Sequence, residues 1–243
     1  MQNTTPLDTS EISILIEKYK PFLAEARRRI LITFVFFLAA TFAGFLFYEN
    51  ILRLLINLLG LTSVNLVFTS PFQFINLAIT CGVACGLVLT FPLILIQLLS
   101  FLRPALQKKE FRTIIWFLPF SLILFVIGFM FGALVMRWQI QIFLESSISI
   151  GVGNMLDISR ILTTIITTAS IMGVSFQFPI IILVLNRVGL INTKSLRKAR
   201  KWVYIAAVIF AILLPLDSII ADVLLSLPLI ILFELTLFLT RFT

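Results

Sequence analysis

Six stretches of the chain are apolar enough, and long enough or nearly so, to cross a lipid bilayer as helices. Spanning the hydrocarbon takes about 20 apolar residues in a helix. The chain has 243 residues, of which 60% are hydrophobic, and its mean hydropathy of +1.12 exceeds that of soluble domains. The stretches cover residues 30–48, 72–102, 113–136, 161–185, 202–216 and 219–239. The sequence therefore predicts an all-α fold, a polytopic membrane bundle of six transmembrane helices with two short C-terminal helices.

One membrane domain is predicted to occupy the whole chain, residues 1–243. No stretch of 50 or more residues has the composition of a separate soluble domain. The predicted domain consists of an N-terminal tail, residues 1–29, and a six-helix bundle, residues 30–243. The tail carries acids and no apolar run before Ile30, so neither a cleavable signal nor an organellar transit peptide is predicted.

The basic residues predict the orientation of the bundle. Of the 19 Lys and Arg residues, five lie in the tail, four in the 103–112 loop, six in the 187–201 loop and one at Arg241. Basic loops stay on the cytoplasmic side of a membrane. Both termini are therefore predicted to face the cytoplasm or the stroma, and the net charge of +8 indicates topology rather than nucleic-acid binding.

The residue inventory argues against an enzyme. The chain has no His, which excludes Ser-His dyads and HExxH zinc sites, and it has no Gly-rich phosphate loop. Cys81 and Cys85 are four residues apart, but a metal site would lack further soft ligands, so they are interpreted as small core residues. We expect no catalytic residue, metal or cofactor.

Two carboxylates flank predicted spans on the same side of the membrane. Glu25 lies five residues before the first span, with Arg28 and Arg29 at the i+3 and i+4 positions where they can pair with it. Glu110 lies three residues before the third span and has basic neighbours that can also pair with it. Instead of pairing locally, the two carboxylates can together bind a ligand that carries two cations near the membrane surface. Guanidinium groups fit best, because they pair with carboxylates through two parallel hydrogen bonds.

Two further polar residues lie in or beside apolar helices. Gln177 is predicted at membrane depth, where a polar group tends to face a partner or a cavity. Alternatively, the side chain of Gln177 forms a hydrogen bond to another helix of the same chain. Asp217 follows the fifth span, and an acid at the end of a helix needs no special role.

Several motifs resemble, in order and spacing, those of the TatC family, the multispanning receptors of twin-arginine protein translocases. The resemblance covers about residues 21–242, and its segments are FLAEARRRIL, FPLILIQLLSFLRPALQKKEFR, MGVSFQFPIIIL, LRKARKWVYI and LLPLDSII. It implies a glove-like bundle of six helices with both termini cytoplasmic. It also implies binding of Arg-Arg signal peptides of folded cargo, and proton-motive-force-driven transport with single-span TatA/TatB-type subunits.

The resemblance also implies roles for individual residues. Glu25 and Glu110 match the two family acids that hold the signal arginines, and Phe101 matches a Phe beside the apolar part of the signal peptide. The residues that match positions shaping the loop and the second helix are Pro92, Gln97, Pro104 and Arg112. Gln177 matches a polar residue that contacts single-span partner subunits, and Asp217 matches the family acid after the fifth helix.

The chain departs from the family pattern in its tail and its first loop. Phe22 stands where many members have His, and Phe111 replaces a base that usually follows the loop Glu. Heavy use of Ile and Phe without His, and no predicted transit peptide, favour a plastid-encoded protein of the thylakoid membrane over one of a bacterial plasma membrane. A homo-oligomer within the receptor complex is expected.

Two alternatives from other classes remain. A small-solute secondary transporter would line a path with Gln177, Asp217 and Asp222, although such folds usually show internal repeats and none is found here. A purely structural scaffold for other membrane proteins is the second. Capture of an Arg-Arg signal peptide but not of its Lys-Lys counterpart separates all three.

Overall fold

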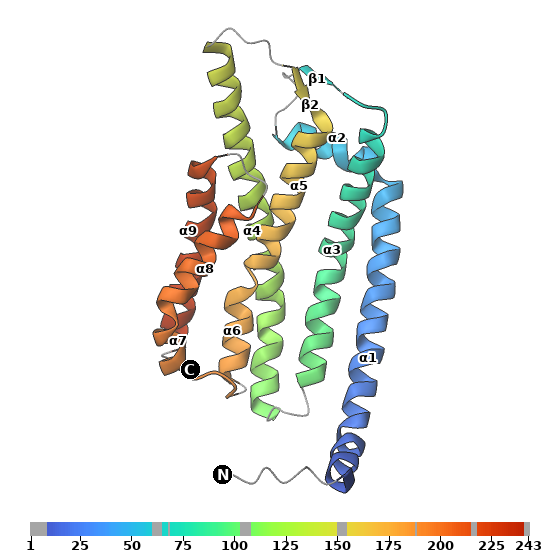
Figure 1. Ribbon diagram of the computed structural model, residues 1–243, viewed down its shortest axis with the longest axis vertical. Coiled ribbons are helices and arrows are strands. Elements are labelled where there is room, and N and C mark those ends of the chain that lie inside the picture. The colour runs from blue at the N-terminus through green and yellow to red at the C-terminus, as the bar shows by residue number, and fades with distance from the viewer. Residues whose placement is uncertain are drawn as a thin grey trace.

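The structure, a computed structural model, is almost entirely helical (Figure 1). It describes residues 9–59, 65–67, 69–102, 108–149, 155–187, 189–214 and 218–240. The helices are α1 (Thr9–Leu46), α2 (Tyr48–Leu59), α3 (Gln73–Leu102), α4 (Lys108–Ser149), α5 (Ile158–Ser175), α6 (Phe178–Arg187), α7 (Thr193–Lys198), α8 (Arg200–Ile212) and α9 (Ile219–Leu239). Two three-residue strands, β1 (Asn65–Val67) and β2 (Met155–Asp157), pair in parallel. The predicted all-α membrane fold is confirmed, with this small sheet as an addition.

Five segments of the described residues are helical, long and apolar enough to cross a membrane. They are Ala24–Leu46, Gln73–Gln97, Pro119–Ser146, Ile158–Arg187 and Ile219–Leu239. The remaining expected span corresponds to α8, which has 13 residues and is about 20 Å long at 1.5 Å per residue. That is shorter than a hydrocarbon core of about 30 Å, so the count of six spans stays a prediction.

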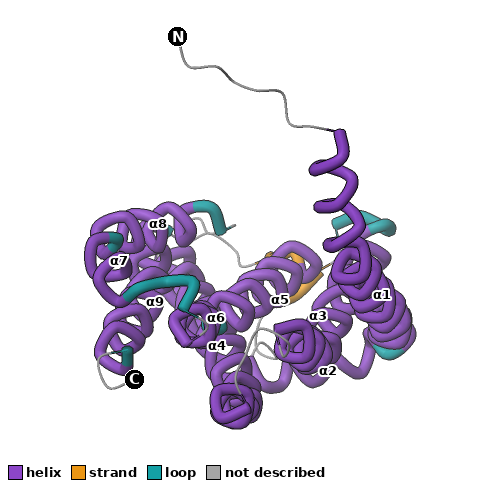
Figure 2. Tube along the Cα trace, turned by 90° about the horizontal axis from the view of Figure 1, so that it is seen from below, coloured by secondary structure: helices purple, strands orange, loops and turns teal. Residues whose placement is uncertain are grey.

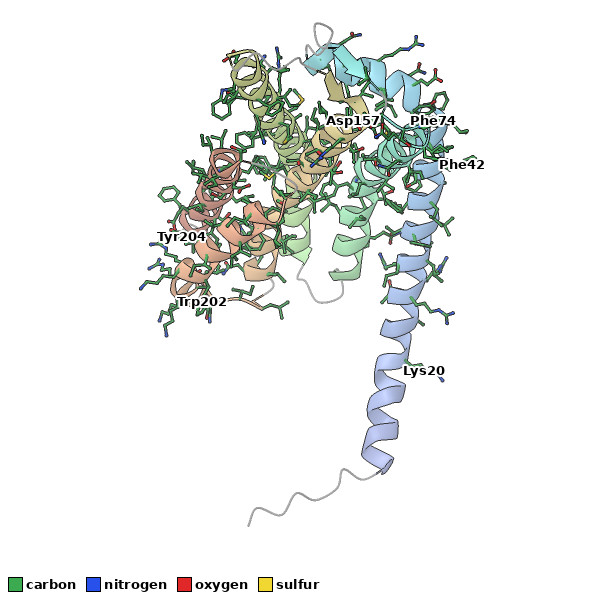
Figure 3. The ribbon with its side chains drawn as sticks, turned by 45° about the horizontal axis from the view of Figure 1, so that its top comes forward. Lys20, Phe42, Phe74, Asp157, Trp202 and Tyr204 are labelled. Carbon is green, nitrogen blue, oxygen red and sulfur yellow. The ribbon has the colours of Figure 1, made fainter. Side chains whose placement is uncertain are left out.

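The start of α1 and the end of α9 lie at the same end of the bundle, the lower end in Figure 1. Figure 3 shows Lys20 on the part of α1 that extends beyond this lower end, whereas Asp157 lies near the opposite, upper end. The helices form a curved row when seen along the bundle, with α1 and α3 on one side and α8 and α9 on the other (Figure 2). The arrangement agrees with the predicted placement of both termini on one side of the membrane.

The core of the bundle lies around α5. Leu162, Ile165 and Met172 are fully buried there between neighbouring helices. Glycines allow the close contacts: a Cβ at Gly128 of α4 would stand 2.8 Å from the backbone oxygen of Met172. A Cβ at Gly82 of α3 would likewise stand 2.8 Å from the backbone oxygen of Thr41 in α1. These small residues let the helices pack closely, as helix association in lipid requires.

Helix boundaries differ from the predicted spans where polar residues continue a helix beyond the apolar run. α1 begins at Thr9 rather than near residue 30, so most of the predicted tail is helical. α4 extends to Ser149, well beyond the expected end at Met136. Hydropathy reports where a helix meets lipid, and Glu, Lys, Arg and Gln are good helix formers that carry the helix into water. In contrast, α3 and α9 match their predicted spans to within one residue.

Candidate functional site

Glu25 lies on α1 at the lower end of the bundle, where its carboxylate is half exposed. The Oε1 atom of Glu25 accepts hydrogen bonds from Arg29 Nη2 at 2.5 Å and from Arg29 Nε at 3.1 Å. The pairing that the i+4 spacing predicted is thus confirmed for Arg29, and the structure gives no such contact for Arg28. The side chain of Glu25 remains 50% exposed, which leaves the carboxylate accessible to a ligand.

The same arginine also reaches α3. Arg29 Nη1 donates to Gln97 Oε1 and to the backbone oxygen of Gln97, both at 3.2 Å. Gln97, 68 residues away in the sequence, was predicted only to shape its helix. The contact could not be predicted from sequence spacing, because it depends on how α1 packs against α3.

A groove of about 490 Å³ runs between α1 and α3 beside this arginine. Its walls are mostly apolar, with Arg29 and Gln97 among the lining residues and the buried Thr90 deeper along α3. The Oγ1 atom of Thr90 has no hydrogen-bond partner among the described residues. The cluster of Glu25, Arg29 and Gln97 is therefore a charged and polar site beside an apolar groove.

The other predicted signal-binding residues are only partly described. Glu110 lies in the first turn of α4, and Phe101 in the last turn of α3. The side chains of Phe101, Glu110 and Arg112, and Pro104 as a whole, fall outside the described residues. The chain path brings the segments bearing Glu25 and Glu110 to the same end of the bundle (Figure 1). Pro92 lies inside α3, which continues through it as one helix.

Gln177 lies at a break in the fourth predicted span, between α5 and α6. The backbone N–H of Gln177 donates to Val174 rather than to Gly173. The side-chain Nε2 of Gln177 instead contacts the oxygen of Gly173 at 3.4 Å, and it donates to the backbone oxygen of Ser121 at 3.2 Å. The break precedes Pro179, whose ring disfavours a continuous helix. The side-chain amide thus supports the interrupted backbone.

Ser121 of α4 completes the hydrogen bonding of Gln177. The Ser121 hydroxyl donates to Gln177 Oε1, and both residues are buried, Gln177 with 3% exposure. Internal hydrogen bonds thus account for the amide without any other subunit. The predicted contact with a single-span partner stays a prediction, as does that of Asp217, which falls outside the described residues.

A polar contact between α8 and α9 was missed in the sequence. Glu234 Oε2 accepts from Arg200 Nη2 at 2.9 Å, and Glu234 Oε1 accepts from Tyr204 Oη at 2.5 Å. The signal was present, because an acid inside an apolar helix usually has a partner. These bonds attach the short α8 to α9.

A second missed cluster joins the end of β2 to the start of α3 at the upper end of the bundle. Asp157 Oδ2 accepts from Thr69 Oγ1 and from Gln73 Nε2, both at 2.6 Å, and Asp157 Oδ1 accepts from the backbone N–H of Arg160 at 3.1 Å. The hydrogen bond from Thr69 is the main reason that the pKa of Asp157 lies below its ordinary value, and the bonds from Arg160 and Gln73 lower it further. The ionised carboxylate thus caps α5 and ties it to the start of α3.

The transporter alternative requires a path lined by Gln177, Asp217 and Asp222, of which Asp217 falls outside the described residues. A second cavity, of about 830 Å³, lies between α4, α5 and the start of α9. Neither this cavity nor the groove between α1 and α3 is lined by Gln177 or Asp222 in the described part of the chain. For Gln177 and Asp222, these two cavities do not support the alternative.

A family model for the Sec-independent protein translocase protein TatC matches residues 21–228. The chain belongs to the TatC family. The TatC protein of Escherichia coli K12 is 32% identical over 226 residues, which cover 90% of this chain and 86% of that protein. The TatC protein of Aquifex aeolicus is 29% identical over 227 residues, with 90% and 92% covered.

A crystal structure of the twin-arginine translocase receptor TatC in DDM superposes on this chain with a TM-score of 0.79 at 27% identity. The match covers 90% of this chain and 98% of that one. Membership of the TatC family makes the chain a multi-pass membrane subunit of a Sec-independent protein translocase. It is a component of a transport machine that works with other Tat subunits, rather than an enzyme.

Proposed function

We propose that the chain is the signal-peptide receptor of a twin-arginine translocase. Glu25 and Glu110 each hold one arginine of an Arg-Arg signal peptide on folded cargo. The observation that carries the proposal is the Glu25 carboxylate, which is half exposed and already engages a guanidinium through two hydrogen bonds. Such a carboxylate accepts a cargo arginine in the same geometry.

The surrounding residues have supporting roles in this proposal. Phe101, at the end of α3, contacts the apolar part of the signal peptide, while Pro92, Pro104 and Arg112 shape the helix and the loop before Glu110. Gln177 and Asp217 contact single-span TatA/TatB-type subunits. Transport is driven by the proton-motive force, and the receptor complex holds several copies of the chain.

The positive-inside rule places the Glu25 end on the cytoplasmic or stromal side. Composition favours the thylakoid membrane as the site of action, with the bacterial plasma membrane as the alternative. A cargo signal then meets Glu25 and Glu110 before it enters the bilayer.

Titration with a synthetic Arg-Arg signal peptide tests the proposal. Replacing one carboxylate leaves a guanidinium without its charged partner, which costs about 2 kcal/mol. Glu25→Gln and Glu110→Gln should each weaken binding about thirtyfold, and high salt should weaken binding to the unmodified protein because the site is only partly shielded. A Lys-Lys peptide should bind poorly throughout.

Glu145→Gln is the matched control. Glu145 is an exposed acid near the upper end of α4, so its removal changes the net charge equally without touching the proposed site. Equal affinity for all four proteins would contradict the receptor proposal and favour a structural role for both carboxylates.

A further inference from the structure

The Glu25 carboxylate, which is proposed to bind a cargo arginine, already has a partner in the structure. Arg29 occupies it, using both Nε and Nη2 on a single carboxylate oxygen. This is the type of contact proposed for a cargo arginine. A second guanidinium on the same carboxylate would bring two positive charges within a few ångströms of each other, which is unfavourable. Binding of cargo at Glu25 and binding of Arg29 at Glu25 therefore oppose each other.

Arg29 has a second set of acceptors that do not involve Glu25. Its Nη1 atom, which Glu25 does not use, already donates to the side-chain oxygen and the backbone oxygen of Gln97. An arginine displaced from Glu25 thus keeps two hydrogen bonds beside the groove between α1 and α3. The displaced guanidinium therefore keeps hydrogen-bond partners. Losing all of them would be costly, because the side chain of Arg29 is only 23% exposed.

We propose that Arg29 is a built-in competitor for the cargo arginine at Glu25, and that Gln97 is the residue that retains Arg29 when cargo displaces it. The inference rests on the proposed function of Glu25. It assigns Gln97 a part in recognition through its effect on Arg29, beyond shaping α3. Because a competitor lowers the affinity of every cation by the same factor, Arg29 raises the threshold for occupancy without changing the preference for arginine over lysine.

Titration of the purified protein in lipid nanodiscs with Arg-Arg and Lys-Lys signal peptides tests this assignment. Exposed ion pairs contribute little, so Arg29→Gln should raise the affinity for the Arg-Arg peptide about threefold. The ratio of Arg-Arg to Lys-Lys affinity should stay unchanged. Gln97→Leu should lower the affinity about twofold, because Arg29 then loses the side-chain acceptor, keeps only the backbone oxygen of residue 97, and is held away from Glu25 less well.

Arg28→Gln is the control for net charge. Arg28 precedes Arg29, is exposed, and loses the same charge without any described contact to Glu25. The gain from Arg29→Gln should exceed that from Arg28→Gln, and this excess should disappear when both changes are made in a Glu25→Gln background. Thermal unfolding of each variant checks that the fold is intact.

Different outcomes would contradict the competitor role of Arg29 and the receptor role of Glu25. Equal gains from Arg29→Gln and Arg28→Gln, with Glu25→Gln still weakening binding, would overturn the competitor assignment and leave the receptor proposal standing. An excess gain that persists without the Glu25 carboxylate would also overturn it. Unchanged binding in Glu25→Gln alone would reject the role of Glu25 as a cargo acceptor, and the competitor with it.

Discussion

α1 and the α5–α6 segment both cross the membrane region, but they are held in opposite ways. Only 11% of an 18-residue apolar stretch of α1 is buried inside the protein, against 67% of the corresponding stretch within residues Ile158–Arg187. α1 packs mainly on α3 and otherwise presents large apolar side chains such as Phe42 to the surroundings. In lipid, an exposed apolar surface is not a liability, because acyl chains solvate it. A peripheral helix can therefore carry an accessible polar site at its end, while the central segment depends on close packing and internal hydrogen bonds.

The largest expected effect comes from placing a large side chain at a glycine where two helices are in close contact, either against the central segment or against α1. A Cβ at Gly128 would lie 2.6 Å from Phe176 Cγ and 2.8 Å from the Met172 backbone oxygen. Gly128→Leu should destabilise the protein by about 3 kcal/mol or more, since overpacking a core forces backbone shifts. Gly82→Leu, which meets α1, should cost less because α1 can move outward into lipid. Thermal unfolding in detergent compares the two variants, and an equal loss in both would contradict the distinction between the helices.

A smaller effect is expected at Gln177, the polar residue of the central segment. Gln177→Leu removes the partners of the Ser121 hydroxyl and of the Ser121 backbone oxygen, and should lower the stability by about 2 kcal/mol. If Gln177 also contacts a single-span partner, recovery of that partner in copurification should fall while signal-peptide capture remains.

Ser121→Ala separates these two roles of Gln177, because it removes the internal hydroxyl but leaves the amide in place. If Ser121→Ala leaves recovery of the single-span partner unchanged while Gln177→Leu abolishes it, the result would support a direct contact between Gln177 and the partner. Unchanged recovery in both variants would leave Gln177 with a structural role only.

The smallest expected effect concerns Asp157, which caps the central segment at its upper end. The folded pKa of Asp157 lies below its ordinary value, so its contribution to stability is present above the ordinary aspartate range and is lost as the pH falls through the folded pKa. Asp157→Ala should cost about 1 kcal/mol at neutral pH, the usual loss for an N-cap.

Asp157→Asn keeps an N-cap side chain but has no charge to lose. Its stability should therefore depend less on pH than that of the unmodified protein below about pH 4. Thermal unfolding measured between acidic and neutral pH checks this, and identical pH profiles for the two proteins would contradict the role of the ionised carboxylate.

Apolar runs predicted helix boundaries best where polar or turn-forming residues mark both ends of the run. α3 and α9 match their predicted spans closely for this reason. α2 was missed because its apolar residues occupy one face of a helix that carries Glu49 and Arg53, rather than forming a continuous run. The break at Gln177 had a local signal in Pro179, but the span was predicted as one helix because its hydropathy is continuous.

The candidate site was predictable only in part, because its contacts cross between helices. The i+4 spacing predicted the pair of Glu25 and Arg29, since it depends on one helix alone. The bonds from Arg29 to Gln97 join residues 68 positions apart, and the bond from Thr69 to Asp157 joins residues 88 positions apart. Such contacts follow from the packing of α1 on α3 and from the register of two short strands, neither of which hydropathy determines.

The small sheet at the upper end of the bundle has a mechanical consequence for a transport subunit. Under the proposed function, traction on a cargo arginine held by Glu25 pulls on α1, and α1 transmits this force mainly to α3. α3 starts at Gln73, whose side chain is bonded to Asp157 in the other half of the chain, next to the paired strands β1 and β2. The pulling force therefore enters at one end of the molecule and is resisted by the packing of α3 on α5 and, at the other end, by bonds between the two halves of the chain. The bundle bears the tension as one unit, and α1 is not drawn out of the membrane alone.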